Sequence, residues 1–532
     1  MGEFTETLKR YGSRIGLRDA TTAITAASIV IVIALIGFAF SANSDDATQA
    51  ADTTGASGTL GGELPSGPGD VGDTGASAEP ASSAPGRAAG GRPAPGSIGV
   101  APDEVPPKDV AITNEVVKVG IFYIEDPGAA NAAAGFGGVG EVNQKRAWDA
   151  MVKEINKSPP FGRKVVPVYF SQTTDEFTSK GAERVWQEAC AKWTQDDKVF
   201  MVWASDDALN RCLNRAGVAQ IGLSGGFSWS KTYKDFPLLA EPMDAAIDRL
   251  AEFEVDQLVK QHFFTEFKEN RPPYTPQKPA DGKARIGLIR YDQPSYDAAA
   301  VSMKKALAKH GLSLCDGCEF KIAYSSDNVP EMLDDATEVN AAIQNCKGRP
   351  GGACTHMLFL GSTNGVRITI FFLDGAEKQA YRPRLGFNPL DAPTAAYDFL
   401  GPSARPQMVD SLLVSDSPES FNVTTDAFRR CKKIFEDAGE TFSGDEAANK
   451  EDQIPFYCDT AFYYRAAMLE AGRQPSAGSW VRGVESVAPV PSASVYRMQT
   501  KPGRHDGSSA IRVGAWDEGC NCYKPRTGVI PV

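Results

Sequence analysis

The sequence predicts an α/β fold of two doubly wound, Rossmann-like lobes joined by a hinge, preceded by one transmembrane helix and a disordered linker. An uncharged apolar stretch lies near the N-terminus, and a segment without aromatic residues follows it. The rest of the chain alternates short apolar strands with amphipathic helices, in two successive series. Such alternation produces parallel sheets that are covered by helices and connected by right-handed crossovers.

The stretch from Ala20 to Ser44 contains no charged residue. Roughly 20 apolar residues cross the core of a bilayer as a helix, and we therefore predict a span at residues 20–42. A cleaved signal peptide is the alternative, because Ala39 and Ser41 are small residues of the kind that signal peptidases accept. The first cysteine is Cys190, which excludes a lipid-modified cysteine directly after the apolar stretch.

The charges on the two sides of this span predict its orientation. Four basic residues precede it and two acidic residues follow it, namely Lys9, Arg10, Arg14 and Arg18, then Asp45 and Asp46. Because Lys and Arg stay in the cytoplasm, residues 1–19 are a predicted cytoplasmic tail of a single-pass cell-membrane protein whose remainder is extracytoplasmic. Residues 43–108 hold too few large apolar side chains to offset the entropy of ordering, and we expect a disordered spacer there.

Composition narrows the function of the remaining residues, 109–532. The formal net charge of −12 and the pI near 5.1 argue against nucleic acid as a partner. All ten cysteines lie in this outward-facing part, where an even number indicates disulfides; plausible short-range pairs are Cys190–Cys212, Cys346–Cys354 and Cys431–Cys458. The alternative is a four-thiolate metal site formed by Cys315, Cys318, Cys346 and Cys354. We prefer disulfides, and we expect no metal and no cofactor.

The first series opens with the strand Val116–Ile124, an almost continuous apolar run as expected of a strand buried on both faces. The elements expected after it are a helix at 143–155, a strand at 164–170, a helix around 185–193, a strand at 199–204, a helix at 208–216 and a strand at 218–223.

A long amphipathic helix at 243–262 and a polar, Pro-rich insertion at 265–283 lead into the second series. Its expected strands are 284–291, a strand near 320–324, 356–360 and 412–415, and its expected helices are 298–310, 329–345 and 366–380. In such sheets ligands bind at the loops after the carboxyl ends of the strands. Two lobes that face each other would therefore form a ligand cleft that closes by a hinge.

Two glycine-containing segments match known functional motifs, but neither has the structural context that its motif requires. Gly135–Gly140 satisfies the dinucleotide fingerprint G-x-G-x-x-G, but about ten residues separate it from its strand, and we interpret it as a flexible loop. Gly222–Gly226 satisfies the hydrolase motif G-x-S-x-G, but residues 227–237 look like a loop rather than the helix that the motif requires. We therefore expect no enzyme, and we interpret Ser224, Gly225 and Ser228 as ligand-binding groups at a strand end.

A second polar group follows the strand at 199–204. Ser205 and Asp206 stand at the start of the next helix, where N-capping alone explains a Ser/Asp pair. The same position is also where ligand contacts of the first lobe should gather, and both interpretations stay open.

Several segments, taken in order, resemble the type I periplasmic binding proteins, and specifically the branched-chain amino acid (leucine-binding) type of ABC transporter substrate-binding protein. The segments are VKVGIFYIEDPG (117–128), RAWDAMVKEIN (146–156), GRKVVPVYF (162–170), VAQIGLSGG (218–226), LAEPMDAAIDRLAEF (239–253) and ARIGLIRYDQPSY (284–296). The resemblance covers about residues 116–490. It implies three crossovers, with a first lobe at about 116–241 and 411–488 and a second lobe at about 242–410 and 489–532.

The resemblance also implies ligand contacts. Ser205 and Ser224 match first-lobe positions that hold the carboxylate of the ligand, and Tyr296 matches a second-lobe tyrosine. The family's amino acid binders carry an acidic residue after the strand that matches 356–360, whereas this chain has Gly361-Ser362-Thr363-Asn364 there. A buried ammonium without an acidic partner is costly, so an amide, a neutral metabolite or a carboxylate is at least as plausible a ligand as an amino acid. Thr363, Asn364 and Asn388 would read such groups through neutral hydrogen bonds.

The resemblance therefore implies a membrane-tethered, extracytoplasmic protein that binds a small-molecule ligand and delivers it to an ABC permease in the membrane. The alternative is a ligand-sensing ectodomain that signals through a partner protein.

Overall fold

The computed structural model of the chain describes residues 111–127, 142–223, 228–268, 278–279, 281–323, 329–349, 351–361, 365–443 and 447–532. The predicted tail (1–19), transmembrane helix (20–42) and linker (43–108) lie outside these residues, and so does the glycine pattern at 135–140. Among the described residues, no helix is both long and apolar enough to cross a membrane.

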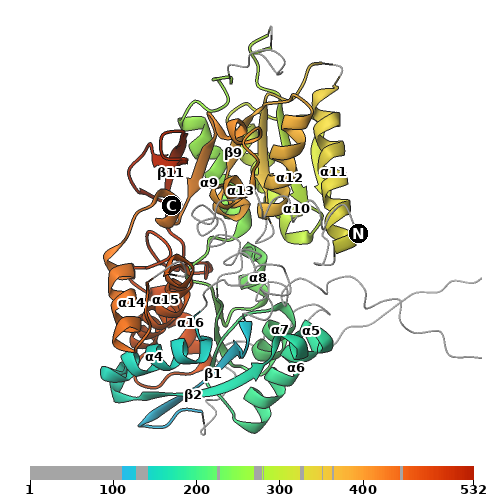
Figure 1. Cartoon of the computed structure of the whole chain (residues 1–532). Coiled ribbons are helices and arrows are strands. Elements are labelled where there is room, and N and C mark those ends of the chain that lie inside the picture. The colour runs from blue at the N-terminus through green and yellow to red at the C-terminus, as the bar shows by residue number, and fades with distance from the viewer. Residues whose placement is uncertain are drawn as a thin grey trace, which may run out of the picture. The chain divides into compact units, whose positions relative to one another are not determined.

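The first sheet is parallel and has the strand order β2-β1-β3-β4-β5. Figure 1 labels its neighbouring strands β1 and β2. Its strands are β1 (Val116–Ile124), β2 (Lys164–Gln172), β3 (Met201–Trp203), β4 (Ala219–Ile221) and β5 (Leu239–Ala240). The helices between them are α4 (Gln144–Lys157), α5 (Thr174–Lys180), α6 (Ala182–Ala191), α7 (Asp207–Arg215) and α8 (Ser230–Asp235). The prediction of a loop at 227–237 is therefore wrong in part, because a short helix, α8, forms within it.

Strand β1 shows why an apolar run without alternation becomes a central strand. Val119 and Ile121 lie in one core cluster with Trp148 of α4. Phe122 points to the opposite face and lies in a second cluster, where its ring centroid is 4.7 Å from that of Trp186 on α6. Because successive side chains of a strand point to opposite faces, only a strand with helices on both faces buries such a run completely.

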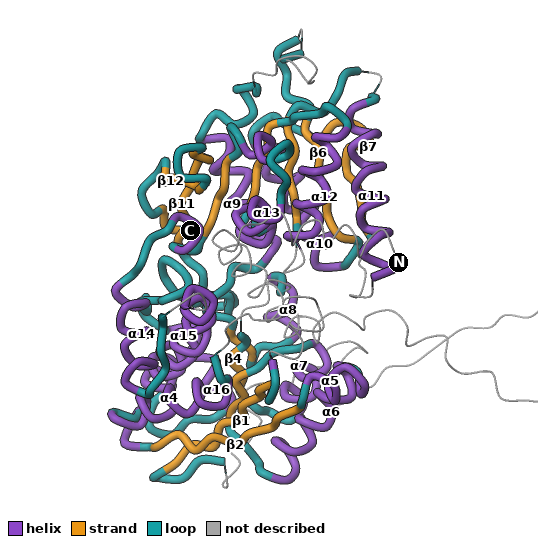
Figure 2. Tube along the Cα trace, viewed as in Figure 1, coloured by secondary structure: helices purple, strands orange, loops and turns teal. Residues whose placement is uncertain are grey.

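The second sheet has the order β12-β11-β10-β9-β8-β6-β7, with β13 paired to β11. Strands β11 and β12 lie on one side of this sheet, and β6 and β7 lie on the other (Figure 2). Strands β6 to β10 pair in parallel, whereas β11 pairs antiparallel with β10, β12 and β13. The strands are β6 (Ile286–Tyr291), β7 (Leu314–Ile322), β8 (His356–Leu360), β9 (Arg384–Phe387), β10 (Leu412–Ser415), β11 (Ala510–Asp517), β12 (Cys522–Pro525) and β13 (Ile530–Pro531). The helices are α9 (Ile247–Lys260), α10 (Pro294–Lys309), α11 (Val329–Lys347), α12 (Gly365–Lys378) and α13 (Pro393–Phe399).

After β10 the chain returns to the first sheet. Helices α14 (Asp426–Asp437), α15 (Ala447–Ala471) and α16 (Ala477–Ser486) contribute to the same core cluster as α4. Short helical turns complete the fold, at Pro160–Gly162, Lys192–Asp196, Pro389–Asp391, Arg405–Met408 and Glu419–Phe421.

Two of the predicted lobe boundaries move. A boundary near residue 411 would place β10 in the first lobe, but β10 pairs with β9 and β11, so the crossing follows Ser415. A boundary near residue 488 would place the next residues in the second lobe, but Val495 and Met498 pack in the core of the first sheet. Both boundaries differ from the prediction for the same reason. A short apolar segment can pack in the interior of either lobe, and only its long-range contacts decide which lobe it joins.

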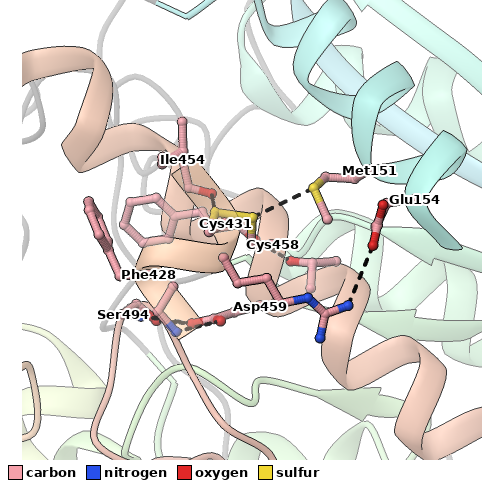
Figure 3. The surroundings of a disulfide bond; sticks show 12 residues. Met151, Glu154, Phe428, Cys431, Ile454, Cys458, Asp459 and Ser494 are labelled. Atoms are coloured by element: carbon pink, nitrogen blue, oxygen red, sulfur yellow. Dashed lines mark hydrogen bonds and ion pairs between the residues drawn. A yellow bond between two sulfur atoms is a disulfide. The ribbon is translucent and has the colours of Figure 1, made fainter. Parts of the chain in front are cut away.

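The ten cysteines form five disulfides, and the three pairings predicted from sequence are confirmed. The other two pairs are Cys315–Cys318 and Cys520–Cys522. The bond between Cys431 and Cys458 joins α14 to α15, and the sulfur of Cys458 lies 3.6 Å from that of Met151 on α4 (Figure 3). This disulfide therefore lies where three helices of the first lobe meet.

Candidate ligand-binding site

The first and third crossovers between the sheets run side by side. The first follows β5, and the third precedes β11. The amide of Glu241 donates to the carbonyl of His505 at 2.9 Å, and the amide of Gly507 donates back to the carbonyl of Glu241 at 2.9 Å. The amide of Ser508 donates to the carbonyl of Asp244 at 2.8 Å. The backbone amides and carbonyls of the two crossovers thus form hydrogen bonds with each other, as those of neighbouring strands do in a sheet.

Asp506 fastens this pair of crossovers to the start of α9. Its carboxylate accepts hydrogen bonds from the amide of Ala246 at 2.9 Å and from Nε of Arg249 at 2.7 Å. Arg249 in turn donates to the carbonyl of Ser508 at 2.8 Å. The Asp506 side chain is 1% exposed, so this ion pair is removed from water.

At the end of β3, the polar residues are buried and hydrogen-bonded. The Asp206 carboxylate accepts from the amide of Ala208 at 2.7 Å, which confirms that Asp206 caps α7. Burial raises the pKa of Asp206 to about 8. The Gln220 amide group donates to the carbonyl of Ala204 and to Oδ1 of Asn210, both at 2.6 Å, and so holds the strand end in place. Whether Asp206 also touches a ligand stays a prediction.

Glu241 is a residue that the sequence analysis did not identify. Its carboxyl group accepts hydrogen bonds from the hydroxyl of Tyr233 at 2.8 Å and from the hydroxyls of Ser205 and Ser228. Two of the predicted ligand residues therefore lie together at this carboxyl group. The only signal in the sequence was an acidic residue directly after the apolar strand β5.

Gly222 makes room for this arrangement at the end of β4. A Cβ atom at position 222 would lie 2.5 Å from Cγ of Glu241 and 2.8 Å from Oγ of Ser205. Any larger residue would therefore push the carboxyl group and the serine apart. The glycine that opens the G-x-S-x-G pattern thus serves close packing against Glu241.

The pKa of Glu241 is raised to about 7 because burial disfavours its charged form, and the nearby Asp244 adds to this effect. The folded state therefore binds the proton more tightly than the unfolded chain, whose carboxyl keeps its ordinary pKa of 4.5. Stability should consequently fall as the pH rises from about 4.5 to 7, and the full cost of the ionised carboxyl should be present above pH 7.

We expect Glu241→Gln to remove this pH dependence. The variant should match the parent near pH 4.5 and should be more stable by up to about 3 kcal/mol at pH 8, since each pKa unit corresponds to about 1.4 kcal/mol. Urea unfolding at several pH values measures the difference. Glu252→Gln, on the exposed side of α9, is the control, and its stability at pH 8 should stay within about 0.5 kcal/mol of the parent. A constant difference for Glu241→Gln would contradict the prediction.

In the second lobe, Tyr296 lies inside the core rather than on a surface. It is 0% exposed, and its ring centroid is 6.2 Å from that of Tyr291. A contact between Tyr296 and a ligand would require the residues that cover it to move, and this contact stays a prediction. Ser224, Gly225, Thr363 and Asn364 lie outside the described residues.

Two buried carboxyl groups lie near the ends of β8 and β9. Asp391 accepts from the amides of Gly361 at 2.8 Å and Asn388 at 2.9 Å. The side-chain amide of Asn388 donates to the carbonyl of Phe359 at 3.0 Å and to Glu254 at 3.2 Å. Burial raises the pKa of Glu254 well above its ordinary value and that of Asp391 to about 7. The sequence directly after β8 contains no acidic residue, but Asp391 reaches Gly361 of that loop from the end of β9.

No protein-family model and no curated protein matches this sequence. Solved structures match it at the level of fold. One is a solute-binding protein of an ABC transporter from R. palustris in complex with 4-hydroxybenzoate, with 10% sequence identity and a TM-score of 0.51 over 78% of this chain and 97% of that chain. Another, from Rhodopseudomonas palustris BisB5, is in complex with 3,4-dihydroxybenzoic acid, with 11% identity and a TM-score of 0.51 over 79% and 98%.

A third match is a possible leucine/isoleucine/valine-binding protein from Rhodopirellula baltica SH 1, with 12% identity and a TM-score of 0.50 over 80% of this chain and 98% of that chain. Identities this low establish the fold alone. The two parallel-rich sheets and these matches show that the chain has the fold of type I periplasmic binding proteins, the fold of leucine-binding and related substrate-binding proteins of ABC transporters.

Proposed function

We propose that this protein is an extracytoplasmic solute-binding protein that closes around a small polar ligand and delivers it to an ABC importer, tethered to the membrane by residues 20–42. The observation that supports this most strongly is the pair of doubly wound sheets, connected by crossovers that run side by side, in a fold that matches solute-binding proteins over nearly their whole length. Recovery of the full chain, but not of residues 109–532 alone, in the membrane fraction tests the tether.

The arrangement of the crossovers supports a hinge motion in which the two lobes open and close around the ligand. The described backbone hydrogen bonds between the first and third crossovers run between residues 241–244 and 505–508. The second crossover contacts the third-crossover region through the amide of Tyr496, which donates to the carbonyl of Asp416 at 2.9 Å. Hinges of this kind concentrate the conformational change in a few residues at the ends of elements, while each sheet with its helices moves as a unit.

We place the ligand at the carboxyl ends of β3 and β4, with Ser205, Asp206, Ser224, Gly225 and Ser228 on the first lobe. Thr363 and Asn364, with Tyr296 after a local movement, belong to the second lobe in this proposal. The hydroxyls of Ser205 and Ser228 already donate to Glu241, which therefore takes up the donors that a ligand carboxylate would need. An ionised ligand carboxylate would also meet a second carboxyl group. A ligand group that donates hydrogen bonds, such as an amide or an amine, suits this end of the site better.

A thermal-shift titration tests the proposal, with a panel of amides, amino acids, short-chain acids and hydroxybenzoates. A ligand at 100 times its dissociation constant should stabilise the protein by about 2.7 kcal/mol. Ser205→Ala removes one hydroxyl at the proposed site and should weaken the binding of that ligand about fivefold to tenfold, the equivalent of about one hydrogen bond.

The control is Ser179→Ala, because the Ser179 hydroxyl bonds only its own helix in the described structure, at the carbonyl of Glu176. It should bind like the parent. Absence of any concentration-dependent shift across the panel would contradict a solute-binding function. An unchanged affinity in Ser205→Ala would contradict the placement of the ligand.

A further inference from the structure

Four cysteines of the second lobe form a single cluster of sulfur atoms. Cys315 and Cys318 lie on β7, Cys346 lies near the end of α11, and Cys354 lies just before β8. They form two disulfides, Cys315–Cys318 and Cys346–Cys354. The sulfur of Cys354 lies 3.7 Å from that of Cys315 and 3.6 Å from that of Cys318, so the two disulfides touch.

The fold builds this contact with two local features. Ile286 of β6 pairs with Leu314 of β7, whereas Leu288 pairs with Glu319, so a step of two residues on β6 faces a step of five on β7. The three extra residues form a bulge that carries the Cys-Asp-Gly-Cys segment, and Gly317 takes the left-handed conformation, with φ of 63°. Nη1 of Arg349 donates to the carbonyl of Gly317 at 3.0 Å and so ties the bulge to the loop between Cys346 and Cys354.

Stabilisation by the disulfides does not account for this contact. The two bonds span sequence separations of only 3 and 8 residues. Short loops restrict the unfolded chain least, because the entropic gain of a cross-link grows with the length of the loop it closes. Neither bond connects the bulge of β7 to the loop before β8, although the sulfur atoms of the two segments are in contact.

The sulfur positions fit a tetrahedral metal site instead. Zn²⁺ binds cysteine sulfur at about 2.3 Å, which places the sulfur atoms of a four-thiolate site about 3.8 Å from one another. The distances of 3.6 and 3.7 Å between the two pairs are already close to this value. The sulfur atoms of Cys315, Cys318 and Cys354 all lie within 4.8 Å of one another, and Cys346 is bonded to the last of them.

The surroundings suit a closed, structural site. Cys318, Cys346 and Cys354 are each 0% exposed, and Cys315 is half-buried. The side chain of Arg285 lies beside the loop, since a Cβ at Gly352 would be 3.6 Å from its Nε atom. Arg349 belongs to this same loop and reaches across to the bulge. Two guanidinium groups therefore lie beside the segments that carry the four cysteines and would offset the excess negative charge of four thiolates around one Zn²⁺.

We propose that Cys315, Cys318, Cys346 and Cys354 bind one Zn²⁺ when both disulfides are reduced, so that the cluster alternates between a two-disulfide state and a zinc state. Two equivalents of a dithiol each transfer two electrons and two protons to one disulfide and become disulfides themselves, which leaves four thiols on the chain. Zn²⁺ then replaces the four thiol protons, and these are released to solvent. In the reverse direction, two equivalents of a small-molecule disulfide each accept two electrons from a pair of thiolates and two protons from solvent and become dithiols. The two disulfides of the chain form again, and the metal is released.

The test is zinc binding to the full chain after anaerobic reduction with a phosphine and removal of the reductant. A competition titration against a chromophoric chelator measures stoichiometry and affinity, and Co²⁺ reports tetrahedral sulfur coordination by its visible absorption. We expect one Zn²⁺ per chain. Cys315→Ser/Cys318→Ser should lose at least about 100-fold in affinity, since two of four ligands are gone. Cys190→Ser/Cys212→Ser, which removes a disulfide of the first lobe, is the matched control and should keep the site.

A second measurement on the unaltered chain keeps the proposal testable even where a double variant does not fold. Alkylation followed by peptide mass mapping should show zinc-dependent protection of Cys315, Cys318, Cys346 and Cys354, and of no other cysteine. Equal zinc affinity in Cys315→Ser/Cys318→Ser and the control, protection of a different set of cysteines, or no stoichiometric zinc binding would each overturn the proposal.

Discussion

Asp506→Ala should lower the free energy of unfolding by about 3–5 kcal/mol, the usual cost of removing one partner of a buried ion pair. The Asp506 carboxylate accepts from the amide of Ala246 and from Arg249, whose side chain is only 14% exposed. Without the carboxylate, the guanidinium would stay buried with its charge uncompensated, and the amide at the start of α9 would lose its acceptor. Urea unfolding followed by circular dichroism measures the loss.

The loss of stability should be large only where the ion pair is buried. Asp437→Ala removes the same charge from an exposed pair with Lys433, whose side chains are 59% and 71% exposed, and should cost less than about 1 kcal/mol. Because Ala246 and Asp506 belong to different crossovers, Asp506→Ala should also loosen the hinge. Equal losses in the free energy of unfolding for the two substitutions would show that the buried ion pair of Asp506 contributes no more to stability than an exposed pair.

Replacing both Cys431 and Cys458 by alanine should destabilise the protein by about 3–4 kcal/mol. The bond closes a sequence separation of 27 residues, which the chain-entropy relation converts to about 3.6 kcal/mol at 25 °C. Both cysteines are 0% exposed in the core that α4, α14 and α15 share. Rearrangement of the neighbouring side chains should therefore recover little of the lost stability. The midpoint of urea unfolding, measured on the oxidised proteins, gives the difference.

The matched control is the double replacement of Cys520 and Cys522, whose bond spans a separation of only 2 residues near the C-terminus. The same relation gives less than about 2 kcal/mol for so short a loop. A loss at Cys431 and Cys458 no larger than in this control would indicate that the disulfide adds nothing beyond the packing of the three helices.

Local patterns were sufficient to predict most strands of the first sheet and half of those of the second. The run Val116–Ile124 is apolar on both of its faces and became β1, which is buried between helices on both sides. Asp206 caps α7, which is one of the two roles that the sequence left open for it, and capping is local because it depends only on the next two or three amides. Three disulfides were predicted from short spacing, since cysteines close along the chain come together at a small cost in loop-closure entropy.

Features that depend on long-range pairing were not predictable in this way. The apolar strand β10 would fit either sheet, and only its pairing with β9 and β11 assigns it to the second. The antiparallel strands β11 and β12 come from residues 489–532, which were assigned to the second lobe from the sequence without any strand. Tyr296 matched a ligand position by resemblance, but the packing of α10 places it in the core.

The sequence by itself thus determined the fold class, the buried strands and the local caps and disulfides, because each follows from interactions between residues close along the chain. Only the tertiary structure decided which residues meet at the ends of the strands. Ser205 follows β3, Ser228 and Tyr233 lie between β4 and β5, and Glu241 follows β5, so three separate segments meet at one carboxyl group. The sulfur cluster of the second lobe has the same origin, because a bulge in β7 and a loop before β8 come into contact only when the sheet has formed.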